Sequence, residues 1–203
     1  MNIEEFSVTP IIYIVLGILF ISGSFFVVKQ KTATIIERFG KFQRVATAGF
    51  NLKIPIIDKK AGSVNLKVME LPVDVETKTK DDVFVRLIVS VQYYVVETKE
   101  GIQTSFYKFD DPARQIQSYV FDSIRSEVPN MFLDDVFSEK DKIAKAVQIE
   151  LADVMEEYGF RIIKALITDI DPDSKVKHAM NEINAAKRMK EAAKEYAEAE
   201  KIK

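Results

Sequence analysis

The chain has 203 residues, with 29 Lys and Arg against 31 Asp and Glu, a formal net charge of −2 at neutral pH. Without an overall basic field it is a poor candidate for nucleic-acid binding, and we expect no nucleic-acid partner. It has no cysteine, which excludes disulfides, thiolate catalysis, thiol-based zinc sites and palmitoylation. Asn2 stands where N-myristoylation requires glycine, so that lipid anchor is excluded too.

The first hydrophobic stretch dominates the sequence. No charged residue lies between Glu5 and Lys29, and nearly every side chain from Pro10 to Val28 is apolar. As a helix this stretch would span about 28 Å, close to the ~30 Å hydrocarbon core of a bilayer. We therefore predict that residues 1–28 form an N-terminal transmembrane anchor. The side chains expected in the span are Ile11, Ile12, Ile14, Val15, Leu16, Ile18, Leu19, Phe20, Ile21, Phe25, Phe26, Val27 and Val28.

Two other interpretations fit this stretch less well. A buried core helix would show a polar stripe, which is missing here, and a signal peptide would begin with basic residues rather than with Met-Asn-Ile-Glu-Glu. Five basic residues follow the span and none precedes it, which predicts a single-pass protein with its main domain on the cytoplasmic side. For Lys29 and Lys31 two interpretations stay open: contact with anionic lipid headgroups, or a role in topology alone.

Residues 29–97 show the alternation of short strands. Thr34–Phe42 predicts two strands about a turn at Gly40, and further short strands follow it. The longest pattern, residues 83–96, places seven apolar side chains from Val83 to Val95 on one face, with Arg86, Ser90 and Gln92 on the other. This is typical of an antiparallel sheet covered on one side. We assign residues 29–97 to a first, strand-rich subdomain.

Residues 98–171 change to a helical period. Asp111-Pro112 predicts a helix start, with Pro129 after its end, and Ser138–Asp141 resembles a capping box before a second helix that ends at Gly159. Residues 160–170 read as a strand. Two helices and a strand make a second subdomain, and the class predicted for the whole is α+β.

A long polar helix is predicted from Asp171-Pro172 to the end of the sequence, residues 172–203, as the start of a coiled coil. Its i,i+4 Lys and Glu pairs, such as Lys194 with Glu198, support an exposed helix. Four small or apolar residues recur at steps of three and four, and we predict that they mediate oligomerisation: Ala186, Met189, Ala193 and Tyr196. The alternative is a solvated single helix held by its own ion pairs.

Motifs for catalysis and metal binding are weak. His178 is the only histidine, and a solvent-facing position is the favoured interpretation. Asp169-x-Asp171-x-Asp173 resembles the start of a calcium loop, but Ser174 and Met180 stand where that loop has glycine and glutamate, so helix capping is favoured. The acidic pairs Asp134-Asp135 and Glu156-Glu157 fit caps or solvated helix faces better than acid–base chemistry. We expect no enzyme activity, no metal site and no cofactor.

The order of these motifs resembles a known family. Glu37-Arg-Phe-Gly-Lys41, the segment 48–58, the strand 77–94, Asp111-Pro112 and the helix after Asp169–Pro172 are similar to the SPFH or band 7 family of stomatins, prohibitins, flotillins and HflK-HflC. Segments 177–188 and 197–202 are most similar to its hypersensitive-induced reaction proteins, although the chain has Asn2 where those proteins usually carry glycine.

The resemblance implies two small α+β subdomains, a coiled-coil helix and large ring- or cage-like oligomers. It implies a membrane-anchored scaffold that homo-oligomerises and organises a membrane microdomain, with membrane lipid and further copies as partners. The alternative is a regulatory subunit that encloses or modulates a membrane protease or channel. A membrane-bound hydrolase using surface carboxylates is the less favoured third hypothesis.

Overall fold

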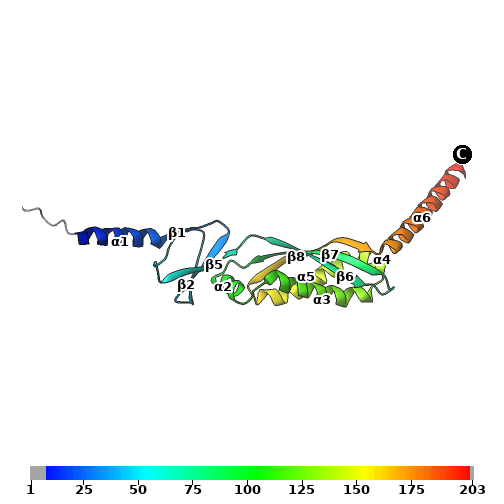
Figure 1. Cartoon of the computed structure of the whole chain (residues 1–203). Coiled ribbons are helices and arrows are strands. Elements are labelled where there is room, and N and C mark those ends of the chain that lie inside the picture. The colour runs from blue at the N-terminus through cyan, green and yellow to red at the C-terminus, as the bar shows by residue number, and fades with distance from the viewer. Residues whose placement is uncertain (1–7, 202–203) are drawn as a thin grey trace, which may run out of the picture. The chain divides into compact units, whose positions relative to one another are not determined.

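The computed structural model describes residues 8–201, and the side-chain environments of residues 12–199. Over this range the chain is α+β, as predicted (Figure 1). The elements are α1 (Val8–Ser24), β1 (Phe25–Val28), β2 (Thr32–Arg38), β3 (Lys41–Ala46), β4 (Gly49–Leu52), β5 (Asp58–Asn65), β6 (Met69–Lys78), β7 (Phe84–Val95), α2 (Lys99–Tyr107), α3 (Pro112–Glu127), the 3-10 turn η1 (Val128–Asn130), α4 (Leu133–Ser138), α5 (Lys140–Glu156), β8 (Phe160–Pro172) and α6 (Ser174–Lys201).

The predicted transmembrane helix is wrong. The helix α1 has 17 residues, about 26 Å at 1.5 Å per residue, and it ends at Ser24. The four residues that were to complete the span, Phe25–Val28, form strand β1 instead and pair with β4. Aromatic and β-branched side chains favour a strand, and β4 supplies the hydrogen-bonding partner. Within residues 8–201, no helix has both the length and the apolar character needed to cross a bilayer.

Strands β1 to β5 form two small sheets. One is the ribbon β1-β4, and the other has the order β3-β2-β5, in which both pairs are antiparallel. The predicted turn at Gly40 is confirmed: Phe39 and Gly40 connect β2 to β3, both with positive φ. A small buried cluster joins the two sheets, made by Phe26 and Val28 of the ribbon with Ile36 and Ala46.

The third sheet has the order β6-β7-β8, with β7 in the centre. The alternation predicted for β7 is confirmed, because Val85, Leu87, Val89 and Val91 are all buried. Ser90, predicted on a solvent face, is also buried, and its hydroxyl donates a hydrogen bond to Glu70 on β6. A neutral hydroxyl is tolerated there because a carboxylate from the neighbouring strand accepts its hydrogen bond.

The helices bury one face each. α3 buries Ile116, Val120 and Ile124, and α5 buries Val147 and Leu151. Figure 1 shows both helices beside the β6-β7-β8 sheet.

Two details of the helical region differ from the prediction. Ser138 does not cap α5 but ends the short helix α4, where its hydroxyl donates to the Asp135 carbonyl. The helix α2 was not predicted, although Thr98 caps it by accepting from the Gly101 amide.

The last helix begins later than predicted. β8 continues through Pro172, and Asp173 rather than Asp171 caps α6, because its carboxylate accepts from the Lys175 amide. The predicted coiled coil is not present: α6 is a single helix whose seam residues Met189 and Tyr196 are 73% and 78% exposed. A seam of two alanines and two larger residues buries little surface unless another helix lies against it.

By its internal contacts the chain divides into two compact units, each assembled from separated segments. Unit 1 contains the described part of residues 1–69 with residues 92–112 and 152–163, and unit 2 contains residues 70–91, 113–151 and the described part of 164–203. The boundaries predicted at residues 28, 97 and 171 stay a prediction.

Candidate membrane interface

The helix α1 exposes large hydrophobic side chains along its described length. Its eight large hydrophobic residues predicted for the span are between 49% and 62% exposed: Ile12, Ile14, Val15, Leu16, Ile18, Leu19, Phe20 and Ile21. The side chain of Ile11 lies outside the described residues. A contiguous apolar surface of this kind in a folded protein marks contact with a membrane or with another protein.

The ribbon β1-β4 extends the apolar surface and divides the predicted span residues into two groups. Phe25 and Val27 are exposed, whereas Phe26 and Val28 point the other way into the cluster with Ile36. Phe50 of β4 stacks on Phe25 with ring centroids 5.1 Å apart, and Leu52 beside it is exposed as well. Alternation along a strand is the reason, because successive side chains point to opposite faces.

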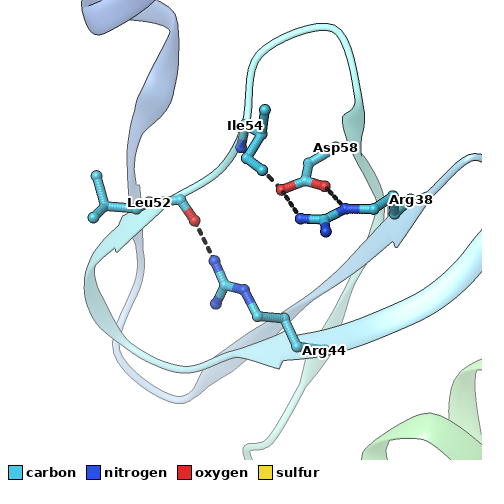
Figure 2. Close-up of polar contacts among 5 residues, drawn as sticks. All are labelled: Arg38, Arg44, Leu52, Ile54 and Asp58. Atoms are coloured by element: carbon cyan, nitrogen blue, oxygen red, sulfur yellow. Dashed lines mark hydrogen bonds and ion pairs between the residues drawn. The ribbon is translucent and has the colours of Figure 1, made fainter.

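An ion pair holds the loop that follows β4. Arg38 at the end of β2 donates from Nε to Asp58 Oδ1 at 2.8 Å and from Nη2 to Oδ2 at 3.4 Å (Figure 2). Asp58 Oδ2 also accepts from the Ile54 amide at 2.9 Å, and the Asp58 amide donates to the Ile54 carbonyl at 2.9 Å. Asp58 is only 6% exposed. One carboxylate therefore fixes both ends of the loop 54–58 to the sheet.

The charge states of this pair follow from its geometry. Hydrogen bonds from Arg38 and then from the Ile54 amide lower the pKa of the Asp58 carboxyl below its usual value, against the opposing effect of burial. The same hydrogen bond raises the pKa of Arg38. Arg44 donates to the Leu52 carbonyl (Figure 2), which ties β3 to the end of β4.

A shallow hollow of about 620 Å³ lies between the end of α1 and the loop 54–58. Its walls come from Phe20 and Ser24 of α1, from Arg38, Arg44 and Asp58, and from the segment 52–55. The Lys53 amide donates to the Ser24 carbonyl at 2.8 Å, so the end of α1 is joined directly to this loop. Apolar walls with cationic groups suit a ligand that is part hydrocarbon and part anion.

The charge of the chain is unevenly distributed. Residues 29–67 contain nine Lys and Arg but only two acidic residues, Glu37 and Asp58, a net charge of +7 within a chain whose total is −2. These residues follow the apolar helix and form the sheets beside it. A juxtaposed basic segment is attracted to anionic lipid by roughly 1 kcal/mol per residue near the surface.

Lys29 and Lys31, the residues considered for headgroup contact, lie in the turn between β1 and β2. The Lys31 ammonium forms an ion pair with Glu97 at 2.6 Å, while Lys29 is exposed and its carbonyl accepts from the Thr32 amide and hydroxyl. Headgroup contact stays a prediction for both residues, and the Glu97 pair competes with it at Lys31.

The four predicted oligomerisation residues lie on α6, all exposed. Ala186, Met189, Ala193 and Tyr196 share one helix, and their contact with other copies stays a prediction. Lys194 and Glu198 form the predicted i,i+4 pair, with 3.9 Å between Nζ and Oε1.

The other polar candidates have structural roles. His178 is exposed, as favoured, with Nδ1 4.0 Å from Glu182 Oε1. Asp173 caps α6 and Asp171 pairs with Lys177, while Asp134 and Asp135 occupy the first turn of α4. Among the described residues no group of three or more His, Asp or Glu side chains is placed to hold a metal ion.

The sequence did not predict the ion pair of Arg38 with Asp58 or the hydrogen bond from the Ile54 amide to Asp58. These residues lie inside two segments that were noted for their family resemblance, 37–41 and 48–58, but nothing in the periodicity indicates that the two segments meet. The charge asymmetry was available from the sequence, by counting charges in segments instead of over the whole chain.

The β1-β4 ribbon, the two three-stranded sheets and the apolar side chains exposed on α1 define an α+β domain with a candidate surface for membrane contact. The family model described as SPFH domain / Band 7 family matches residues 26–201. The chain belongs to this family, which confirms the resemblance noted in the sequence.

Two curated relatives indicate where in the family the chain falls. It is 44% identical over 176 residues to Hypersensitive-induced response protein 4 of Arabidopsis thaliana, a match that covers 86% of this chain and 60% of that protein. It is 29% identical over 167 residues to Stomatin-like protein stl-1 of Caenorhabditis elegans, covering 82% of this chain and 50% of that one.

A third relative is human Stomatin-like protein 2, mitochondrial. The identity is 27% over 165 residues, which covers 81% of this chain and 46% of the relative. The chain thus spans about half the length of the curated relatives it matches.

Proposed function

We propose that the protein is a membrane-associated scaffold that homo-oligomerises into a large ring or cage and organises a membrane microdomain. Its family membership supports a scaffold or regulatory role at a membrane. The observation that carries the proposal is the combination of exposed apolar side chains on α1 and the ribbon with the +7 charge of residues 29–67. Apolar surface provides insertion, and the basic residues select an anionic leaflet.

We further propose that the protein acts without catalysis. One histidine, no cysteine and no glycine-rich phosphate loop leave few groups for nucleophilic or acid–base chemistry. The exposed helix α6 gives a scaffold a second surface, on which copies can meet through Ala186 and Ala193. Heterologous contacts of this kind close into a ring only at one subunit number.

Vesicle binding and particle size test the proposal together. The full chain, transferred from detergent to vesicles of phosphatidylcholine with or without 30% phosphatidylserine, should co-sediment more with the anionic vesicles, and the preference should fall at high salt. Mass measurement of the detergent-extracted particle should give a large multiple of 23.1 kDa. Failure to bind either vesicle would overturn the membrane role, and a monomeric particle would overturn the scaffold.

A regulatory subunit of a membrane protease or channel would use the same surfaces. A mild-detergent pull-down that recovers such a protein in stoichiometric amount would favour this role over an independent scaffold.

A further inference from the structure

Two large hydrophobic side chains of unit 1 occupy backbone conformations that disfavour them. Phe39 has φ 51° and Ile56 has φ 73°, in the left-handed region where a Cβ atom is crowded. Lys31 and Asp82 are the other non-glycine residues with positive φ in the described chain; Asp82 is of a type that tolerates this region, and Lys31 forms an ion pair. Phe39 and Ile56 have no comparable polar compensation.

Both side chains are also almost completely exposed. Phe39 is 81% exposed and Ile56 is 97% exposed. The turn that Phe39 forms with Gly40 has the two positive φ values for which Asn-Gly is the favoured sequence. At an exposed position in a strained conformation, a smaller polar residue would serve the fold as well as a large hydrophobic one. The presence of the hydrophobic side chain therefore points to a function.

The strand register brings the two residues to the same end of one sheet. In the β3-β2-β5 sheet, Arg38 pairs with Lys41 on one side and with Asp58 on the other. Phe39 directly follows Arg38, and Ile56 lies two residues before Asp58. The two tips are therefore neighbours, and the ion pair of Arg38 with Asp58 lies at the base of both.

Basic residues flank both tips in the sequence. Lys41 follows the Phe39-Gly40 turn, Lys59 follows Asp58, and Lys53 precedes the loop of Ile56. The Lys53 amide, just before this loop, donates to the Ser24 carbonyl at the end of α1, so the loop of Ile56 starts directly beside the end of the apolar helix. Strained apolar tips flanked in the sequence by lysines are suited to the boundary between anionic headgroups and acyl chains.

We propose that Phe39 and Ile56 form a two-loop anchor that inserts into the interfacial layer of an anionic bilayer, with Arg38 and Asp58 as positioning residues that present both loops. The inference rests on the proposed membrane role and adds the residues that enter the lipid. A fluid interface can receive isolated side chains from every direction. A protein partner would instead need a separate pocket for each tip.

The chain has no tryptophan, which allows a direct test. Phe39→Trp and Ile56→Trp each give a full-length protein with a single fluorophore, and Phe132→Trp is the matched control at a 49% exposed aromatic position of unit 2. Each protein is mixed with vesicles of phosphatidylcholine and phosphatidylserine whose phosphatidylcholine acyl chains are brominated near the headgroup. We expect a blue shift and quenching for the Phe39→Trp and Ile56→Trp variants and neither effect for the control.

The outcomes separate the anchor from the membrane role. If the variants co-sediment with the vesicles but their emission is not quenched at either position, the anchor is wrong while the membrane role stands. If none of the proteins binds, both are wrong. A blue shift that depends on protein concentration and not on lipid would assign the tips to contacts between copies and overturn the anchor.

A second variant tests whether the positive φ values of Phe39 and Ile56 cost stability. Replacing both residues by asparagine, which tolerates positive φ, should raise the thermal midpoint and lower the vesicle partition coefficient by about tenfold or more, the scale expected for losing the burial of a large apolar side chain. Unchanged partition would overturn the anchor. A lower thermal midpoint would show that the side chains serve the fold, and would overturn it as well.

Discussion

Residues 29–67 and residues 68–203 use apolar and charged side chains in opposite ways. The first segment has nine basic and two acidic residues, and it leaves large apolar side chains such as Phe50 and Ile56 exposed. The second has 20 basic and 27 acidic residues, and its long strand β7 and helices α3 and α5 bury their apolar faces. A net charge of −2 for the whole chain hides this division.

The difference shows that a hydrophobic pattern has two meanings. In β7 the alternation describes a core, because Val85, Leu87, Val89 and Val91 are covered by the same chain. In β1 and β4 the same alternation leaves Val27 and Phe50 on an uncovered face. We infer that residues 68–203 use their apolar side chains mainly to build a packed core, and that residues 29–67, with α1, supply the contact surface.

The largest loss of stability is expected from a substitution in the packed core of residues 68–203, at Val89 of β7. Val89→Asp places a carboxylate at a fully buried position of β7 and should reduce the free energy of unfolding by roughly 3 kcal/mol or more, enough to unfold a marginal domain. Phe84→Asp, on the same strand but 57% exposed, should cost less than about 1 kcal/mol. Urea unfolding monitored by circular dichroism measures both. Equal losses would show that burial does not separate the two positions.

Assembly is expected to depend on α6. Substitutions on this exposed helix should therefore change the oligomer and leave both regions folded. Ala186→Glu combined with Ala193→Glu puts carboxylates on the proposed contact face and should reduce the particle from a large oligomer to small species. Ala185→Glu combined with Ala192→Glu is the matched control on the adjacent face with the same spacing. Light scattering in detergent measures the mass. A large particle from the Ala186 and Ala193 variant would move the assembly contacts to other surfaces.

A smaller effect, specific to the contact surface, is expected at low pH. Because folding lowers the pKa of Asp58, its ion pair stabilises the fold above the unfolded value of about 3.9, and the contribution is lost as the pH falls through the lower folded value. Asp58→Asn should lower the thermal midpoint at pH 7 and flatten its decline below about pH 4. Asp122→Asn, at an exposed position of α3, is the control. A decline as steep as in the unsubstituted protein would assign the acid sensitivity to other carboxyls, such as Asp74 and Asp81.

The smallest effect concerns Tyr107, which connects α2 to β2. Its hydroxyl donates to Glu37 Oε1 at 2.6 Å, and burial followed by this hydrogen bond raises the pKa of Tyr107 to about 12. The neutral phenol stabilises the fold, so this contribution is present below about pH 10 and is lost as the pH rises through about 12. Tyr107→Phe should cost about 0.5 kcal/mol at pH 7 in urea unfolding.

Absorbance at 295 nm during alkaline titration provides the second measurement. Glu37→Gln removes the carboxylate and should lower the pKa of Tyr107, so that one tyrosine ionises earlier than in the unsubstituted chain. An unchanged titration would mean that Glu37 does not influence the phenol.

Local signals in the sequence determined much of the fold. Strict alternation located β7, Asp111-Pro112 located the start of α3, and Gly40 located the hairpin, because each depends on the conformational preferences of neighbouring residues. The ordered motifs also placed the chain in the SPFH/Band 7 family, since such a series is specific even where its parts are not.

The tertiary structure decided where the hydrophobic N-terminal stretch stops being helical and what its side chains contact. Phe25–Val28 are as apolar as the helix before them, and only pairing with Gly49–Leu52 turns them into a strand with Phe26 and Val28 buried. The ion pair between Arg38 and Asp58 likewise joins residues 20 positions apart through the register of β2 and β5. Hydropathy measures transfer from water and periodicity measures local geometry. Neither contains the long-range pairing that sends Phe26 into a core and leaves Ile56 at an exposed tip.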